Sequence, residues 1–479
     1  MSVAQAYISS PIDKRELKLF LWFGIATLIF GICGALLNMP YAGLIPGLFL
    51  LCALLVRSPI AMLISLFATF SVAVHLGFLT LDTPVLLLLI CYWYFNKKKH
   101  NIQDEFVWVR RLAWANVVWI GILFTIHIND YDNWQWVVGT GIRLILYFVM
   151  FIVTLDIVKE LSRKEILHVI RWAWFFSIIV SIIAIYQHYG LGLSRVNSIL
   201  EAHHAHLGDY ATVGALLGGI ITVWTERSDE RLIGWVSIIL ALLAVVLSES
   251  RASIIGVSVG LAFFGLLGGF RGIVVVSIVV ALLYGSGLIT QELQKEKGLT
   301  FQQSREYITN ANLEKANYDV SSVTRVFEWV GVLNFEQKTD ILHILCGVGP
   351  GNFGEAMRPY TTLYALYVKQ PGTSLNGAHN NYLHVLAELG FVGSILFWGF
   401  LVFLSYMVLR LGKRGNHRQK NITKITIATT VALFVSGITQ ETFYSQLGMG
   451  NFLGLYLVVI VLILHLKTDK ALISQYKDK

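Results

Sequence analysis

At Gly377-Ala378-His379-Asn380-Asn381-Tyr382-Leu383, a long polar stretch of the chain ends and an apolar run of about thirty residues begins. If Asn380 or Asn381 caps the incoming helix, His379 lies beside free backbone N–H groups at the positive end of the helix dipole. The dipole and partial desolvation both disfavour the charged imidazolium. A neutral imidazole at a membrane surface can accept a proton near pH 7, so we predict that His379 is a general base. The alternative is a histidine that only hydrogen-bonds its own loop.

The composition indicates a membrane protein. The chain has 479 residues, of which 56% are hydrophobic and 14% are charged, and its mean hydropathy is +0.65. Apolar runs recur along it, so we predict an all-α polytopic membrane protein with about 12–14 transmembrane helices. The expected spans are residues 17–37, 41–56, 60–80, 84–95, 107–127, 136–158, 166–189, 207–225, 232–247, 253–268, 273–288, 381–409, 425–438 and 449–466.

The distribution of lysine and arginine orients these spans. Cytoplasmic loops of membrane proteins carry an excess of positive charge, and most of the 37 lysines and arginines fall on the side that includes both ends of the chain. We therefore expect cytoplasmic termini. The chain divides into N-terminal transmembrane helices (1–288), an outer loop with amphipathic helices (289–380), and C-terminal transmembrane helices with a short cytoplasmic tail (381–479). The net charge of +8 fits contact with membrane lipid and predicts no nucleic-acid partner.

Two groups of residues offer metal-ligand chemistry, but neither has a complete ligand set. Asp130-Tyr131-Asp132 lies in a short outer loop and resembles the D-x-D of metal-dependent sugar transferases. His203, His204 and His206 form a cluster without a distant carboxylate or thiolate, and such a cluster more often lines a polar vestibule. We predict no metal and no cofactor.

Three arginines are candidates for binding an anion. Arg143 lies about seven residues inside its expected span, where a charge needs a partner or a ligand. Arg251 stands on a very short hairpin between two spans, and Arg325 stands in the long loop. A guanidinium suits phosphate oxygens; the alternative for Arg251 is contact with lipid headgroups. Because Glu388 lies at the same expected depth as Arg143, we also predict that these two residues pair across helices.

The long loop contains two further patterns. Ser321 or Ser322 can cap a helix whose apolar stripe leaves Arg325, Glu328 and Trp329 on another face. The residues of that stripe are Val323, Val326, Phe327 and Val330. Downstream, Gly347–Phe353 is rich in glycine, but no strand and helix frame it as a dinucleotide site, so we interpret it as a tight turn.

These motifs together resemble one family. The shared features are Ser250-Arg251 on a short hairpin, Arg325 in a loop helix, Gly347–Phe353, and His379-Asn380-Asn381-Tyr382-Leu383 followed by Ala387-Glu388-Leu389-Gly390-Phe391-Val392-Gly393. In these features the chain resembles the bacterial O-antigen ligase and polymerase superfamily. That superfamily includes ligases, repeat-unit polymerases and protein O-oligosaccharyltransferases. The similarity is weaker around residues 202–210, where the histidine cluster replaces an asparagine-rich turn of the family.

The resemblance implies a metal-independent inverting glycosyltransferase with a GT-C-like helical fold. Such an enzyme takes a glycan from undecaprenyl diphosphate and transfers it to a glycan or lipid-glycan acceptor at the periplasmic face of the bacterial inner membrane. It implies that His379 is the catalytic base and that Arg251 and Arg325 bind the donor diphosphate. Arg143, Glu388, Asn380 and Tyr382 are the supporting residues that we expect around them.

We therefore predict a membrane glycan transferase of surface polysaccharide synthesis, O-antigen ligase-like. The first alternative is a repeat-unit polymerase of the same superfamily. The second belongs to a different class, a transporter of a small anion or a lipid-linked glycan with the arginines along its path. Transporters often contain repeated halves with broken helices at the midplane, and the sequence has no internal repeat of that kind.

Overall fold

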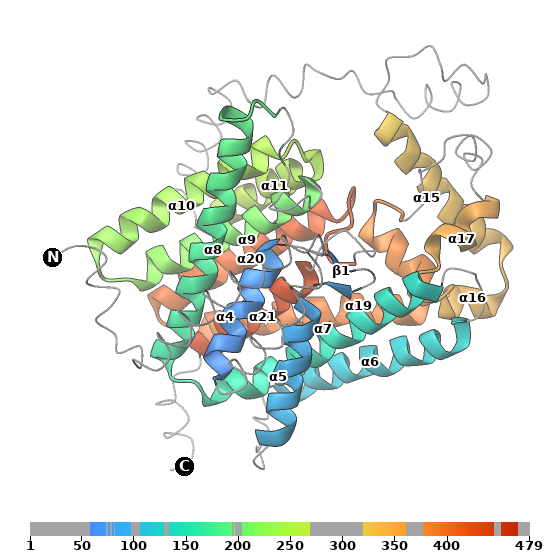
Figure 1. Ribbon diagram of the computed structural model, residues 1–479, viewed down its shortest axis with the longest axis horizontal. Helices are drawn as coiled ribbons and strands as arrows, with labels where there is room; N and C mark the ends of the chain where they lie inside the picture. The colour runs from blue at the N-terminus through green and yellow to red at the C-terminus, as the bar shows by residue number, and fades with distance from the viewer. Residues whose placement is uncertain are drawn as a thin grey trace, which may run out of the picture.

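The computed structural model describes residues 58–72, 75–76, 79–80, 82–96, 106–128, 134–193, 196, 204–268, 320–360, 377–444 and 452–467. Helices account for nearly all of these residues (Figure 1). They are α4 (Pro59–Val72), α5 (Asp82–Asn96), α6 (Val107–His127), α7 (Trp134–Glu160), α8 (Arg163–Tyr189), α9 (His204–Trp224), α10 (Ser228–Leu247), α11 (Arg251–Gly268), α15 (Val320–Lys338), α16 (Ile341–Cys346), α17 (Phe353–Met357), η4 (Arg358–Tyr360), α19 (Asn381–Arg414), α20 (His417–Ser436) and α21 (Phe452–Lys467).

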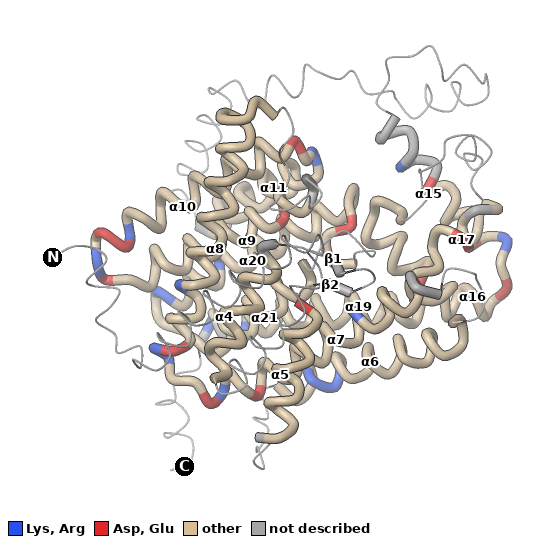
Figure 2. Tube along the Cα trace, viewed as in Figure 1, with Lys and Arg blue, Asp and Glu red and all other residues tan. Residues whose placement is uncertain are grey.

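Several of these helices have the length and apolarity needed to cross a bilayer. In the described residues there are 6 such helices, α6 to α10 and α19, and four shorter apolar ones, α4, α5, α11 and α21. Figure 2 shows that Lys, Arg, Asp and Glu gather toward helix ends and loops, while most helix bodies carry few of them. The protein is therefore an all-α polytopic membrane protein, as the sequence predicts. The expected spans 17–37, 41–56 and 273–288 lie outside the described residues.

One expected span differs from the structure. The run 60–80 was predicted to be a single helix, but α4 ends at Val72, and an antiparallel hairpin of β1 (His75–Leu76) and β2 (Leu79–Thr80) follows it. The prediction was wrong because hydropathy alone does not separate helix from strand in a short apolar run.

The core of the bundle is built around α21. This helix is apolar on every side, and its residues from Leu457 to Leu464 are at most 1% exposed. A helix of this kind must be enclosed by others, and α21 packs against α4, α7, α8, α9 and α19. Nearby, Phe148 and Phe151 of α7 meet the ring of Phe400 of α19 edge to face at 5.2 and 5.0 Å between centroids. These contacts fix α19, which carries the candidate site, to the centre of the bundle.

A break in α19 receives the glycine-rich segment that precedes it in the chain. Gly390 has φ 67° and ψ −175° inside the helix, a conformation that is essentially restricted to glycine. The break frees the carbonyl groups of Ala387 and Glu388, which accept hydrogen bonds from the backbone N–H groups of Val348 and Gly349, each at 2.9 Å. The segment predicted to be a tight turn therefore supplies hydrogen-bond donors to the carbonyl groups that the break leaves free. Buried backbone groups need such partners.

The loop helices gather at one end of the bundle. Figure 1 shows α15, α16 and α17 close together near the ends of α6 and α19. The contacts between the helices agree with this view, because α16 packs on α19 and α15 packs on both α17 and α19. The N-terminus of α19, with His379 just before it, lies under this layer.

Candidate active site

The N-terminus of α19 is held by two adjacent asparagines. Asn380 caps the helix, since its Oδ1 accepts from the backbone N–H groups of Tyr382 at 2.9 Å and Leu383 at 3.0 Å. This confirms the predicted cap. Asn381 is fully buried, and its Oδ1 accepts from the N–H groups of Phe443 and Tyr444. Asn381 thus joins the start of α19 to residues 437–444, the described residues that follow α20 and are called the 437–444 segment.

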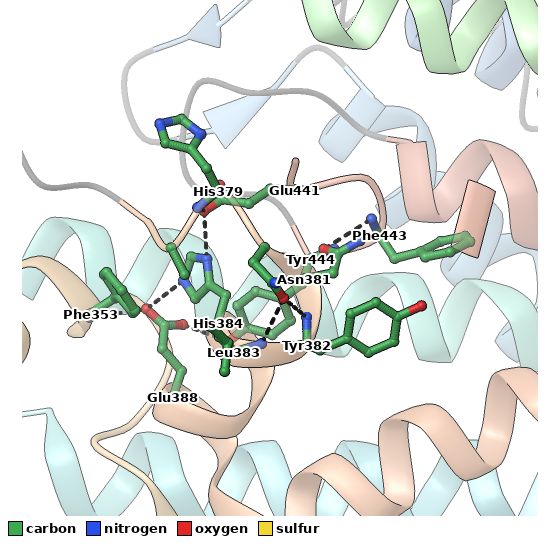
Figure 3. A network of polar contacts seen from close by, with 12 residues as sticks. Phe353, His379, Asn381, Tyr382, Leu383, His384, Glu388, Glu441, Phe443 and Tyr444 are labelled. Carbon is green, nitrogen blue, oxygen red and sulfur yellow. Dashed lines mark hydrogen bonds and ion pairs between the residues drawn. The ribbon is translucent and has the colours of Figure 1, made fainter. Parts of the chain in front are cut away.

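His379 stands immediately before the cap in a strained conformation. Its φ of 45° lies in the left-handed region, which costs a non-glycine residue about 1 kcal/mol or more. Its backbone N–H donates to Glu441 Oε1 at 3.2 Å, which helps to hold that conformation. In Figure 3 the ring of His379 points away from the carboxylates below it. Burial lowers the pKa of His379; Arg325 and His384 lower it further, while Glu441 opposes them. The neutral imidazole is therefore favoured.

Beneath His379 lies a buried group of ionisable side chains (Figure 3). His384 Nδ1 is 2.8 Å from Glu441 Oε1, and His384 Nε2 is 3.2 Å from Glu388 Oε1. The Glu388 carboxylate also accepts from the N–H groups of Gly351 at 2.8 Å and Phe353 at 3.1 Å. Burial raises the pKa of Glu441, but His384 and the N–H of His379 outweigh it, so that this pKa lies below its ordinary value. The ionised form of Glu441 is therefore favoured.

Two tyrosines near the start of α19 have different roles. The hydroxyl of Tyr444 donates to Glu388 Oε2 at 2.6 Å. The hydroxyl of Tyr382 donates to the carbonyl of Phe434 at 2.8 Å, and its ring stacks on Trp398 with centroids 4.5 Å apart. Tyr382 thus supports the packing of α19 on α20, whereas Tyr444 belongs to the ionisable group.

Helix α15 covers the site with a face that the sequence pattern did not predict. Glu328 is only 3% exposed, whereas Val330 of the predicted apolar stripe is 36% exposed. The side that packs inward carries Glu328, Val332 and Phe335 at helical spacing, and Trp329 Nε1 donates to the carbonyl of Ala378 at 2.8 Å. The prediction was wrong at Glu328 and Val330 because the partner surface is itself charged, so apolar spacing alone could not identify the inward face.

Arg325 and Glu328 of α15 interact electrostatically with the ionisable group below His379. Burial raises the pKa of Glu328 well above its ordinary value; the charge of Glu441 adds to this, while Arg325 and His384 oppose it. Arg325 is half-buried and close enough to His379 to lower the pKa of that histidine. Arg325, predicted to bind an anion, thus lies within electrostatic range of the predicted base.

Arg251 is the first residue of α11, and buried hydrogen bonds fix the helix turn that carries it. Ser250 Oγ donates to Gln440 Oε1 at 2.9 Å, and Gln440 Nε2 donates to Asp209 Oδ1 at 2.7 Å. Ser253 Oγ also donates to Asp209, at 3.2 Å. Arg251 itself is exposed. Because Gln440 and Glu441 are adjacent, the 437–444 segment connects the turn that carries Arg251 with the group below His379.

The predicted pair of Arg143 and Glu388 does not form. The two oxygens of Glu388 receive His384, Tyr444 and two backbone N–H groups instead. Arg143 is buried on α7, one turn before Tyr147, whose hydroxyl donates to Asp82 at 3.2 Å, and its charge acts on Tyr147. The prediction failed because equal depth in the bilayer does not determine which way a residue faces around its helix.

The residues considered for metal binding fall mostly beyond the described part of the chain. Asp130, Asp132 and His203 lie outside it, and His206 is buried near the start of α9. Within the described ranges, no group of three or more His, Cys, Asp or Glu side chains has an arrangement that could hold a metal ion.

The sequence reasoning missed several residues of this site. His384 and Glu388 are four residues apart, so they share a helix face, and that spacing could have drawn attention to His384. Glu441 was missed because it is 57 residues from His384 in the chain, and only the fold brings the two side chains together. Asp209 was missed because it stands in an apolar run, and only the folded chain brings the hydroxyl groups of Ser253 and Ser436 to it.

The fold and the site define a polytopic helical membrane protein with an ionisable centre at one end of its bundle. Residues 236–398 match the family model described as O-antigen ligase. The match supports the O-antigen ligase and polymerase superfamily that the sequence motifs resemble, and the matched residues include Arg251, Arg325, His379 and Glu388. No curated protein matches the chain significantly. The family match supports a glycan-transferring membrane enzyme of polysaccharide biosynthesis.

Proposed function

We propose that this protein transfers a glycan from undecaprenyl diphosphate to an acceptor hydroxyl at the periplasmic face of the inner membrane, in the manner of an O-antigen ligase. The observation that carries the proposal is the position of His379. It stands at the capped N-terminus of α19, with its backbone N–H bound to Glu441 and Arg325 near enough to act on its charge. A neutral imidazole beside a guanidinium suits the deprotonation of a hydroxyl near a phosphate ester.

The proposed reaction is a single inverting displacement. His379 accepts the proton of the acceptor hydroxyl, whose oxygen forms a bond to C1 of the donor sugar. The bond between C1 and the diphosphate oxygen breaks, and its electron pair leaves with undecaprenyl diphosphate. Arg325 and Arg251 stabilise the charge that develops on the diphosphate, a role that fixed guanidinium groups can perform without a metal ion. His379 as base contributes about 10²- to 10⁴-fold to the rate.

The test is transfer by the purified protein. Lipid-linked glycan and a candidate acceptor are incubated with the protein in detergent, and the product and the released undecaprenyl diphosphate are measured. Both should appear in equal amounts. Intact donor after prolonged incubation, with folded protein and several acceptors, would contradict the proposal.

A genetic experiment separates ligase from polymerase. Surface polysaccharide from a strain that lacks the gene is resolved by gel electrophoresis. Loss of attachment with polymer length retained supports the ligase, and loss of polymer length supports the polymerase.

A further inference from the structure

His384 lies between two buried carboxylates, and neither of its ring nitrogens faces water. Nδ1 is 2.8 Å from Glu441 and Nε2 is 3.2 Å from Glu388, with all three side chains at most 2% exposed. The contact to Glu441 is a hydrogen bond, and the contact to Glu388 is an ion pair with poorer hydrogen-bond geometry. An ionised carboxylate only accepts hydrogen bonds. A ring nitrogen without a hydrogen would therefore place a lone pair against the oxygen it faces.

Both carboxylates accept hydrogen bonds from backbone groups as well as lying against His384, although Glu441 Oε2 has no hydrogen-bond partner among the described residues. Besides His384, Glu388 accepts from two backbone N–H groups and from the hydroxyl of Tyr444. Glu441 accepts from the backbone N–H of His379 in addition to His384. Two buried negative charges at such a short distance from one imidazole require a positive charge between them.

We propose that His384 is a positioning residue: its imidazolium balances one of the two carboxylates and holds Glu441 against the backbone of His379. This inference rests on the proposed function, in which His379 is the base. His384 does not contact substrate in the proposed reaction. It acts through Glu441, which fixes the backbone of His379 in its left-handed conformation.

The charge of His384 also determines the field at His379. The groups that face this region are Glu388 and His384 of α19, Glu441 and Tyr444 of the 437–444 segment, and Arg325 and Glu328 of α15. Removing the imidazolium leaves both carboxylates with less compensation, and negative charge favours the imidazolium form of His379. The pKa of His379 would then rise, so the acid limb of the pH–rate profile should move to higher pH.

The variants H384Q and E388Q, singly and together, test this inference in the transfer assay. We expect H384Q to lose on the order of tenfold more activity at about pH 6 than at about pH 8.5. Adding E388Q removes one negative charge along with the positive one, so the double variant should move the acid limb back toward that of the unmodified protein. H343Q is the matched control, because His343 also contacts a carboxylate, that of Asp340 at 2.9 Å, but at a partly exposed position. Equal losses at both pH values in H384Q, or no return in the double variant, would contradict the inference.

A measurement on the unmodified protein covers the case in which the variants do not fold. Nitrogen-15 NMR of histidine-labelled protein, with His384 assigned by difference from any variant that can be purified or by its contacts to Tyr444, reports whether both ring nitrogens carry hydrogen. A doubly protonated His384 near pH 7 supports the inference, and a neutral ring overturns it whatever the activity. Absence of transfer by protein with a charged His384 would instead overturn the proposed function.

Discussion

Replacing Gly390 with alanine tests whether the break in α19 builds the site. Gly390 is the residue at which α19 leaves helical geometry, and its conformation is essentially unavailable to alanine. A Cβ at this position would also collide with the carbonyl of Leu345 and the backbone nitrogen of Gly347. Because these are backbone atoms, no side-chain rotation can relieve the contact. Either α19 straightens or the glycine-rich segment moves away.

The expected loss of stability follows from the contacts. The backbone conformation alone costs alanine about 1–3 kcal/mol. Loss of the two hydrogen bonds that Val348 and Gly349 donate adds about 1 kcal/mol each. We therefore expect Gly390→Ala to destabilise the protein by about 3–5 kcal/mol. Displacement of the segment would also remove the N–H donors of Glu388, so transfer activity should fall by more than the loss of folded protein explains.

Gly399→Ala is the matched control on the same helix. No atom lies within 4 Å of a Cβ at Gly399, and alanine in a regular helix is favoured over glycine by about 0.5–1 kcal/mol. The unfolding temperatures of both variants are measured in the same detergent, together with their transfer rates. A Gly390→Ala variant as stable and active as Gly399→Ala would refute the reasoning.

The remaining predictions concern the proposed reaction. His379→Ala should abolish transfer without loss of folded protein, whereas exposed His417→Ala should not affect it; full activity of the first variant excludes His379 as base. Since the pKa of His379 is lowered, the base stays neutral below the ordinary histidine value, so the rate should hold its plateau to a lower pH than free imidazole would allow. Arg251→Lys and Arg325→Lys should both transfer poorly, because an ammonium cannot bind phosphate oxygens in the bidentate manner of arginine; normal turnover would leave only a general electrostatic role. A chelator should not affect the purified enzyme, and inhibition that added cation reverses would restore Asp130 and Asp132 as candidates.

The parts of the site that are local in the chain could be predicted from the sequence. Hydropathy predicted the observed bounds of α6, Val107–His127. Each segment that crosses the membrane must satisfy its own backbone hydrogen bonds and be apolar over its own length, so its bounds can be read from its own residues. The cap by Asn380 was predictable for a similar reason, since it involves only the next three residues. These features depend on interactions between residues that are close in the chain, so they can be predicted from the sequence.

Only the tertiary structure decided which charges meet. His384 and Glu441 are 57 residues apart in the chain and 2.8 Å apart in space, and nothing in either local sequence indicates the contact. Depth in the bilayer paired Arg143 with Glu388 wrongly, since the rotation of each helix about its axis depends on packing over the whole bundle. Gly390 shows both sides: its residue type permits a break in α19, but only the docking of Val348 and Gly349 stabilises one. The sequence by itself indicated most of the described spans, the cap and the candidate base, and packing between distant segments determined the buried charge balance beneath that base.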